Sequence, residues 1–337
     1  MTGAVRVGVV GAGAVAARHV RVLGELGAHI VAVADTDSER AEALASSAGA
    51  QSVANVEGVL DAGVDAVYVC VPPFAHGSIE DQVVEARVAL FVEKPLGIGV
   101  DHAEELARRI GAAGLVTGTG YHWRNLDTLT RARGLLEGGG PYLASAWWID
   151  CLPPPEWWPR RSGSGGQVVE QATHVIDVLR ALLGEMDVID ARPLRSGHAG
   201  PVGDPEVVDD ATVALMRSAD GSLVTLTTSC LAPSAGRRGV EVLGPGTFVA
   251  LSEQELIVTG GPGAGRWEPT VDPRVEVDRA FLRAVVAGDP TAVPVSYAEA
   301  LRTHRLAVAI AAAAAASSCA STVGGDGPVA NRAGEGR

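Results

Sequence analysis

Three polar residues of this sequence, Lys94, Glu170 and His174, have the side chains needed to stabilise charge and move a proton. Lys94 follows the apolar run Ala89–Val92, which predicts a buried strand. An ammonium group at the carboxyl end of such a strand can stabilise a developing alkoxide or polarise a carbonyl. Glu170 and His174 stand four positions apart in a predicted helix over 167–183, so their side chains would share one face. Because an imidazole titrates near neutral pH, His174 can take or return a hydroxyl proton.

A glycine-rich loop lies ahead of these residues, between the apolar run Val5–Val10 and a helical pattern that ends at Leu26. Such a loop lets the backbone approach a pyrophosphate and directs the helix N-terminus at its negative charge. Asp35 ends the next apolar run, where a carboxylate can accept hydrogen bonds from ribose hydroxyls. The cofactor contacts predicted here are Gly11, Ala12, Gly13, Ala14, Val15 and Asp35.

The charge of Asp35, with Asp37 nearby, predicts NAD as the cofactor and disfavours NADP, whose 2′-phosphate it would repel. Arg40 is the one residue that could soften this preference, by folding back over the ribose. The four cysteines, by contrast, are far apart and have no metal-ligand spacing, so the sequence predicts no metal site.

Five segments, in their order and spacing, make the sequence resemble the glucose–fructose oxidoreductase/inositol dehydrogenase (Gfo/Idh/MocA) family of NAD(P)-dependent oxidoreductases. They span about the first 185 residues and comprise the GAGAVA loop, Val71–His76, Glu93–Pro95, Gly120–Arg124 and Gly165–Asp177. The resemblance implies hydride transfer between NAD and the secondary alcohol or ketone of a sugar or cyclitol, as in inositol dehydrogenases. It also implies cofactor contacts from loops after later strands, at Val71, Pro72, His76, Glu93, Lys94 and Arg124. For His76, capping of the following helix is an equally good explanation.

Glu170 departs from the family pattern, because inositol dehydrogenase-like members usually carry aspartate at this position. Glutamate keeps the charge but reaches one methylene farther, so Glu170 is expected to position substrate or to bias Lys94 and His174. Trp rings can cover the apolar faces of sugars while polar neighbours bind their hydroxyls. The expected substrate contacts are Tyr121, Trp123, Trp157, Trp158 and Asp177, with the Trp157–Trp158 loop as pocket or lid.

The predicted fold is α/β, with two domains. Continuous apolar strands alternate with helical patterns over residues 1–122, which predicts a Rossmann dinucleotide-binding domain with a parallel sheet. Residues 123–320 mix strand candidates, turns and helices, which predicts an α+β substrate-binding domain with an open, mainly antiparallel sheet. A last helix, at about 297–318, is expected to pack back toward the first domain. Residues 321–337 are glycine-rich and aperiodic, and are expected to be a disordered tail.

Composition narrows the function further. The net charge of −13 over 337 residues argues against nucleic acid and anionic membranes as partners, because both require clustered positive charge. We find no leader and no apolar run long enough to span a bilayer, so a soluble, cytoplasmic protein is expected, and a homo-oligomer (dimer or tetramer) through the second sheet. Two alternatives stay open: a glycosidase of the same fold that uses NAD transiently, and a cofactor-binding regulator without turnover.

Overall fold

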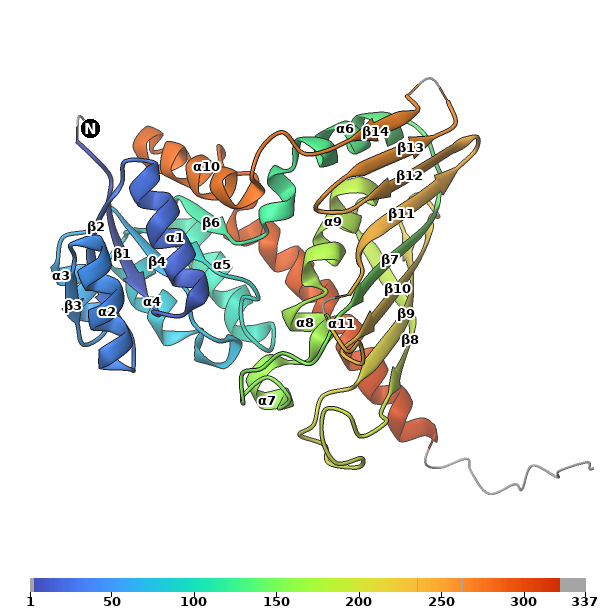
Figure 1. Ribbon diagram of the computed structural model, residues 1–337, viewed down its shortest axis with the longest axis horizontal. Coiled ribbons are helices and arrows are strands. Elements are labelled where there is room, and N and C mark those ends of the chain that lie inside the picture. The colour runs from blue at the N-terminus through green and yellow to red at the C-terminus, as the bar shows by residue number, and fades with distance from the viewer. Residues whose placement is uncertain (1–2, 235, 262, 322–337) are drawn as a thin grey trace, which may run out of the picture.

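The first 120 residues build a six-stranded parallel sheet in the computed structural model, which describes residues 3–234, 236–261 and 263–321 (Figure 1). The strand order is that of the Rossmann fold, and it reverses between β1 and β4, where such sheets bind ligands. The strands, in spatial order, are β3 (Gln51–Val53), β2 (His29–Ala34), β1 (Arg6–Val10), β4 (Ala66–Val69), β5 (Ala89–Val92) and β6 (Thr117–Thr119). β3 is absent from the predicted strands because its three residues contain no apolar run.

Helices cover both faces of this parallel sheet, which is why its strands are apolar throughout. The helices between the strands are α1 (Ala14–Glu25), α2 (Ser38–Ala48), α3 (Val56–Asp61), α4 (Ser78–Glu85) and α5 (Asp101–Ala113), with a 3₁₀ turn, η1, at Pro73–Ala75. The side chain of Asp37 caps the first turn of α2, and Gly49 ends that helix in the left-handed conformation. By contrast, Gly13 begins α1 without a side-chain cap, so the first N–H groups of α1 have no side-chain partner there.

Two late helices complete the core of the first domain. One core joins Val277 and Phe281 of α10 (Pro273–Ala287) to Tyr68 and Phe91 of the parallel sheet. On the other face, the first turns of α11 (Tyr297–Ser321) pack against α4 and α5. The predicted boundary at residue 122 therefore does not describe this core, because α10 and the start of α11 return to the first domain. α11 contributes residues to the core of the first domain and, later in the helix, to the core beneath the second sheet.

The second sheet has eight strands and is mixed but mainly antiparallel, as predicted; β7 and β10 form its one parallel pair among the described strands. In spatial order the strands are β14 (Gly265–Trp267), β13 (Leu256–Thr259), β12 (Thr247–Leu251), β11 (Arg238–Gly244), β7 (Leu143–Ile149), β10 (Leu223–Ser229), β9 (Ala211–Ser218) and β8 (Met186–Leu194). β8 and β14 had not been predicted.

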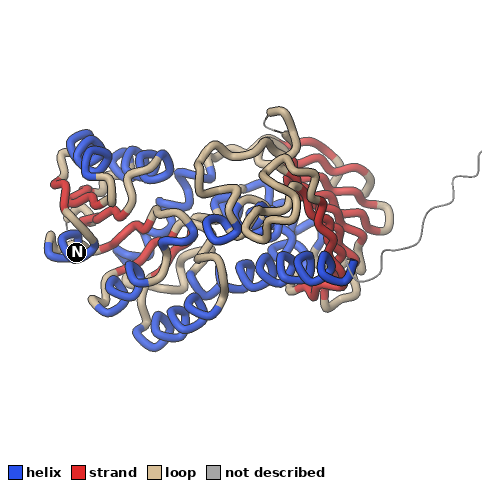
Figure 2. Tube along the Cα trace, turned by 90° about the horizontal axis from the view of Figure 1, so that it is seen from below, coloured by secondary structure: helices blue, strands red, loops and turns tan. Residues whose placement is uncertain are grey.

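Helices cover only one face of the second sheet, the face toward the first domain (Figure 2). They include α6 (Asp127–Leu136), α9 (Thr173–Leu183) and the later part of α11, while shorter turns are η2 (His122–Asn125), α7 (Arg161–Ser164) and α8 (Gln167–Glu170). No described element covers the outer face, and residues of β9 accordingly alternate between buried and exposed. α11 ends the described chain, and the predicted tail beyond Ser321 lies outside the described residues. Of the described helices, none has the length and apolar character needed to cross a bilayer.

Candidate active site

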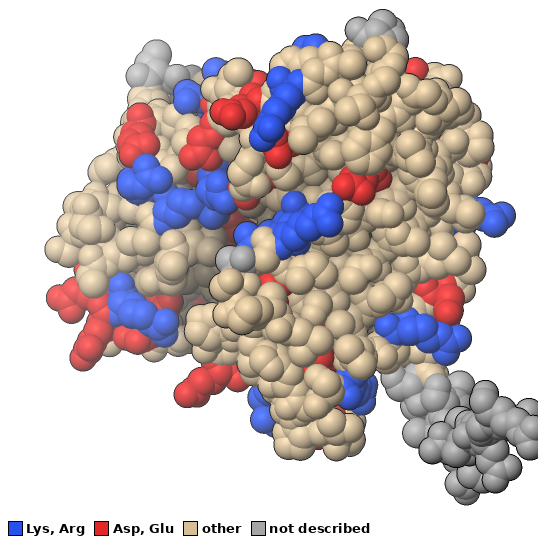
Figure 3. All heavy atoms as spheres, turned by 45° about the vertical axis from the view of Figure 1, so that its right-hand side comes forward, with Lys and Arg blue, Asp and Glu red and all other residues tan. Residues whose placement is uncertain are grey.

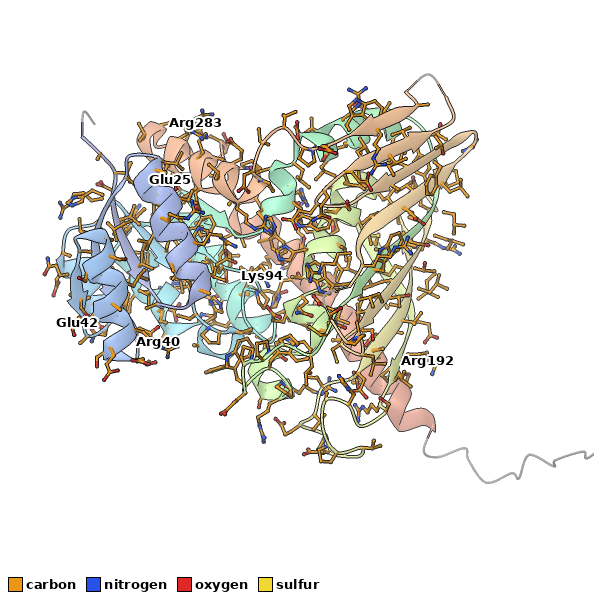
Figure 4. All side chains as sticks on the ribbon, viewed as in Figure 1. Glu25, Arg40, Glu42, Lys94, Arg192 and Arg283 are labelled. Atoms are coloured by element: carbon orange, nitrogen blue, oxygen red, sulfur yellow. The ribbon has the colours of Figure 1, made fainter. Side chains whose placement is uncertain are left out.

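Lys94 lies between the two domains, two residues beyond the end of β5 (Figure 4). Its Nζ donates to Oε1 of Glu170 at 2.9 Å and to the main-chain carbonyl of Glu170 at 2.7 Å. The ion pair is largely buried, which strengthens it relative to a surface pair. The Lys94–Pro95 peptide bond is cis. The structure thus brings together Lys94 and Glu170, which stand far apart in the sequence.

The helix predicted over 167–183 is interrupted, which corrects the expectation of one continuous face. α8 ends at Glu170 and α9 begins at Thr173. In a continuous helix the Glu170 carbonyl would accept from the N–H of His174, but that N–H instead points to the carbonyl of Gln171. The interruption therefore releases a carbonyl to bind Lys94, and helical periodicity could not reveal it.

Glu170 is held from its other side by Trp158, whose Nε1 donates to Oε2 at 2.9 Å. With Lys94 on Oε1, each carboxylate oxygen of Glu170 has one partner. These two contacts hold the carboxylate of Glu170 against the ammonium of Lys94.

His174 is buried in the same region, among aromatic rings. Trp148 stacks on its imidazole with 5.5 Å between centroids, and His122 lies edge-on at 4.9 Å. Burial lowers the pKa of His174 well below its usual value, and the nearby charge of Lys94 adds to this. Nδ1 is buried without a hydrogen-bond partner in the described chain, whereas Nε2 is not among the fully buried atoms. His174 is therefore a neutral imidazole at pH 7, with Nε2 as the nitrogen that can meet a ligand.

Several ion pairs lie near His174, and they come from the second domain, from the turn η2 and from α10. Arg238 pairs with Asp150 and its guanidinium lies over the Trp148 ring, 4.9 Å from the centroid. His122 contacts Glu253 at 3.1 Å, and Arg274 pairs with the same carboxylate. These residues come from separate turns and strands, so no motif in the sequence identified them. Basic side chains gather beside the hollow between the two lobes in Figure 3.

The glycine loop has the geometry that a dinucleotide requires. Gly11 has a φ of +96°, and a Cβ there would lie 2.2 Å from the carbonyl oxygen of Cys70. A Cβ on Gly13 would meet nothing within 4 Å, and the residues that follow it, Ala14 and Val15, are exposed. The uncapped start of α1 and the open space in front of it therefore suit a pyrophosphate. Asp35 lies beside this loop and accepts the N–H of Ala12 at 2.6 Å.

Four of the residues expected to contact substrate are buried. Asp177 is paired with Arg124 at 2.7 Å and Thr303, and Tyr121 donates to or accepts from Thr173. Because they are buried and paired, these side chains have no free surface for a ligand. They support the elements around the site, and the expectation that they contact substrate is corrected. The four, each 1% exposed or less, are Tyr121, Trp123, Trp158 and Asp177. The guanidinium of Arg124, which was expected to contact the cofactor, instead forms ion pairs with Asp177 and Glu299.

Trp157 and His76 both lie near the turn η1. Trp157 meets Phe74 of η1 edge-on, with centroids 6.2 Å apart, so the Trp-rich loop reaches the first domain. His76 Nδ1 lies 2.5 Å from Oε1 of Glu80, whose other oxygen accepts the N–H of Gly77 at the start of α4. Its capping role through Glu80 is thus visible, while Nε2 of His76 has no partner among the described residues. Val71 and Pro72 are partly exposed beside this turn.

Residues 5–121 match the model described as "Oxidoreductase family, NAD-binding Rossmann fold" (GFO_IDH_MocA), and residues 129–247 match that of the GFO/IDH/MocA C-terminal domain. An inositol 2-dehydrogenase of Mycolicibacterium gilvum is 30% identical over 80% of this chain and 76% of its own. The myo-inositol dehydrogenase Hyg17 of Streptomyces leeuwenhoekii is 30% identical over 85% of this chain and 90% of its own.

Among solved structures, a levoglucosan dehydrogenase in complex with NADH and levoglucosan superposes with a TM-score of 0.83. The match covers 93% of this chain and 97% of that one at 19% identity, a level that establishes the shared fold.

Proposed function

The chain belongs to the Gfo/Idh/MocA oxidoreductase family, and we propose that it is an NAD-dependent dehydrogenase of a neutral sugar or cyclitol. The observation that carries the proposal is that Lys94, paired with Glu170, lies near a neutral His174, in a chain that also has the glycine loop. A cofactor-binding regulator would have no use for this set. Metal ligation plays no part in the proposal.

The residues proposed to hold NAD follow the carboxyl ends of neighbouring strands. The start of α1 binds the pyrophosphate, and Asp35 binds the adenosine ribose. Residues 71–76 and Glu93 line the part of the site nearer Lys94. When bound, NAD accepts or returns the hydride. The full set proposed as cofactor contacts is Gly11, Ala12, Gly13, Ala14, Val15, Asp35, Val71, Pro72, His76, Glu93 and Lys94.

In the proposed reaction, His174 transfers the proton and Lys94 stabilises the charge on the substrate oxygen. In oxidation, Nε2 of neutral His174 accepts the hydroxyl proton. The ammonium of Lys94 donates a hydrogen bond to the same oxygen and stabilises its negative charge as that charge develops. Glu170 holds the ammonium in place through its carboxylate and its main-chain carbonyl, so that the amine is directed at the substrate oxygen. Reduction uses the same groups in the opposite order.

The charges around the cleft favour an uncharged substrate rich in hydroxyls. The arginines and the lysine near His174 each have a carboxylate partner. The pairs are Arg238 with Asp150, Arg274 with Glu253, Arg18 with Glu93, and Lys94 with Glu170. No cation among them is left to hold a phosphate or a carboxylate of a substrate. Hydroxyl groups both donate and accept, so they can bind beside such pairs without an uncompensated charge. Relatives named for inositol and levoglucosan act on molecules of this class.

A substrate screen tests the function. Inositols, aldoses, 1,6-anhydro sugars and keto-sugars are supplied with NAD⁺ or NADH, and NADH absorbance is followed in both directions. We expect turnover with at least one neutral polyol and little with its phosphate or uronate counterpart. Bond cleavage without net change in NADH would favour the NAD-dependent glycosidase. Tight NAD binding without any turnover would favour a regulator.

Replacement of Asp35 by serine is expected to relax cofactor preference. The wild-type protein should bind NADH at least tenfold more tightly than NADPH, because Asp35 repels the 2′-phosphate, and the variant should narrow this ratio to a few-fold. Arg40 is engaged with Asp37 at 2.8 Å and lies 3.7 Å from Asp35, so it offers no free cation to the phosphate. Fluorescence titration measures both dissociation constants. Glu42→Gln, on the exposed side of α2 (Figure 4), is the matched control and should leave the ratio unchanged. A wild-type preference for NADPH would overturn the assignment.

We further propose that two copies of the chain associate through the outer face of the second sheet. Leu143 of β7 stands in register between Leu223 of β10 and Leu243 of β11, and all three are exposed. An apolar row of this kind on an uncovered sheet is typical of an interface. Sedimentation of the wild-type protein should show a dimer or larger species, and Leu143→Glu with Leu243→Glu should dissociate it. Val286→Glu, at an exposed site on α10, is the control that should not. A monomeric wild-type protein would refute this.

A further inference from the structure

His19, on α1, is fully buried and lies between two carboxylates. Its Nδ1 is 2.8 Å from Oδ1 of Asp278 on α10, and its Nε2 is 2.8 Å from Oε1 of Glu93. A neutral imidazole has a single N–H, so it can donate to only one of two carboxylates. A histidine that donates to both is an imidazolium, and His19 therefore carries a positive charge.

The surroundings of His19 agree with that charge. Burial alone would lower its pKa, but the hydrogen bonds and charges of Asp278 and Glu93 raise the pKa to about 9. Burial would likewise raise the pKa of Glu93, yet the hydrogen bond and charge of His19, with smaller contributions from Arg18 and Lys94, lower it to about 2. The rings of Tyr68 and Phe91 lie 5.3 and 5.2 Å from the imidazole and exclude water. In this setting each hydrogen bond is stronger than in water.

Three further titratable or charged groups face the cluster: Arg18, Tyr68 and Cys70. Arg18 Nη2 lies 3.2 Å from both Oε1 of Glu93 and Nε2 of His19. Because Nε2 of the imidazolium is itself a donor, Arg18 donates its hydrogen bond to the Glu93 carboxylate. Burial raises the pKa of both Tyr68 and Cys70 well above their usual values, so both stay neutral. Burial raises the pKa of Asp278, while the hydrogen bond and charge of His19 act in the opposite direction. With both nitrogens of His19 within hydrogen-bond distance of a carboxylate, the cluster pairs two cations, His19 and Arg18, with two carboxylates, Glu93 and Asp278.

Glu93 connects this cluster to the active site. Its Oε2 accepts the main-chain N–H of Lys94 at 3.1 Å. The main chain at Gly120 packs directly against the same carboxylate, because a Cβ at this position would lie only 2.4 Å from Oε2. A carboxylate with so little room to move fixes the main chain of Lys94, the residue whose ammonium must reach the substrate oxygen.

We propose that His19, anchored by Asp278, is a positioning residue that fixes Glu93 and through it the place of Lys94 in the active site. The inference rests on the role proposed above for Lys94. It gives α10, which comes late in the chain, a part in catalysis, because Asp278 supplies the anion that keeps His19 charged. Neither His19 nor Asp278 touches substrate, and both act through Glu93.

Lys94 is the only lysine in the sequence, which allows a direct test. Protein grown with ¹³C,¹⁵N-lysine gives a single Lys94 main-chain signal, and the ring of His19 is followed in ¹³C-histidine protein. In the wild-type protein, both signals should shift together as the pH rises through about 9. The melting temperature should fall as the pH rises from about 6.5 to about 9, because a raised folded pKa adds stability that is complete below the unfolded value, about 6.5, and lost above the folded one.

Asp278→Asn and His19→Gln complete the test. Asp278→Asn removes an anion and should move the His19 titration to lower pH, shift the Lys94 signal at pH 8 and lower kcat by roughly ten- to a hundredfold. NAD affinity should stay within a few-fold. His19→Gln keeps a donor for Glu93 without the charge, and should lose less activity than His19→Ala. His304→Asn, at another fully buried histidine, is the control that should lower the melting temperature but leave the Lys94 signal in place.

The inference fails if the Lys94 signal stays fixed while His19 titrates in the wild-type protein, a result that requires no variant to fold. It fails equally if both variants are destabilised yet keep the wild-type kcat and Lys94 signal, since His19 would then serve stability alone. The NMR readout does not depend on turnover. If the proposed substrate or reaction is wrong, the substrate screen will show it, and the NMR result will still test the role of His19.

Discussion

Replacement of Lys94 by alanine is expected to lower kcat by roughly 10²–10³-fold, or about 3–4 kcal/mol in the barrier, while NAD affinity changes by no more than a few-fold. The ammonium is held by both the carboxylate and the carbonyl of Glu170, so it is already in place before charge develops on the substrate oxygen. Its loss removes stabilisation that matters mainly in the transition state. Steady-state kinetics and a separate NAD titration measure the two quantities.

The single lysine also permits a test without mutation. An amine-acylating reagent should inactivate the wild-type protein in step with modification of residue 94, located by mass spectrometry, and Lys94→Ala should lose nothing further. Arg21→Ala removes a cation from an exposed ion pair with Glu25 and should keep activity within about twofold. Normal turnover by Lys94→Ala would make Lys94 a structural residue at the end of a strand, and the mechanism would be wrong.

Replacement of His174 by asparagine is expected to keep the fold and lower the rate by roughly 10²–10⁴-fold. Asn is polar and close in size, so it can occupy the space beside Trp148 and His122. It cannot accept and return a proton at the position of Nε2. A melting curve must accompany the kinetics, since an unfolded variant would say nothing of the proton. A folded variant with the wild-type rate would reduce His174 to a core residue.

The pH profile provides the second readout for His174. Because burial and the charge of Lys94 lower the pKa of His174, the imidazole stays neutral down to pH values below the usual range for histidine. Oxidation should therefore persist at mildly acidic pH and fall only where His174 becomes protonated, and His174→Asn should lack this limb. Glu170→Gln should move the limb to still lower pH, because a lost negative charge makes the imidazolium less stable. His304→Asn, which removes a different buried histidine, should retain the limb.

Much of the fold could be predicted because its signals are local. Short valine-rich runs alternating with helical patterns are sufficient for a parallel sheet, and the glycine loop with Asp35 identifies where that sheet binds a dinucleotide. The strands that the sequence does not predict are those without an apolar run, such as β3, or those interrupted by charged residues and a proline, such as β8. The packing of α10 against the first domain could not be predicted either, because an amphipathic helix does not specify which core it joins.

For the site, the sequence by itself determined the chemical types: one lysine after a buried strand, one histidine and one glutamate near a helix start, and an aspartate beside the glycine loop. Tertiary structure decided what each of them does. The gap between α8 and α9 turned a carbonyl toward Lys94, and Trp158 and Asp177 became supports because the fold buried them. The charge on His19 depends on two carboxylates that the chain brings together only when α10 packs against α1. Hydrogen bonds between groups distant in sequence are set by packing, and packing is not readable from the spacing of residues along the chain.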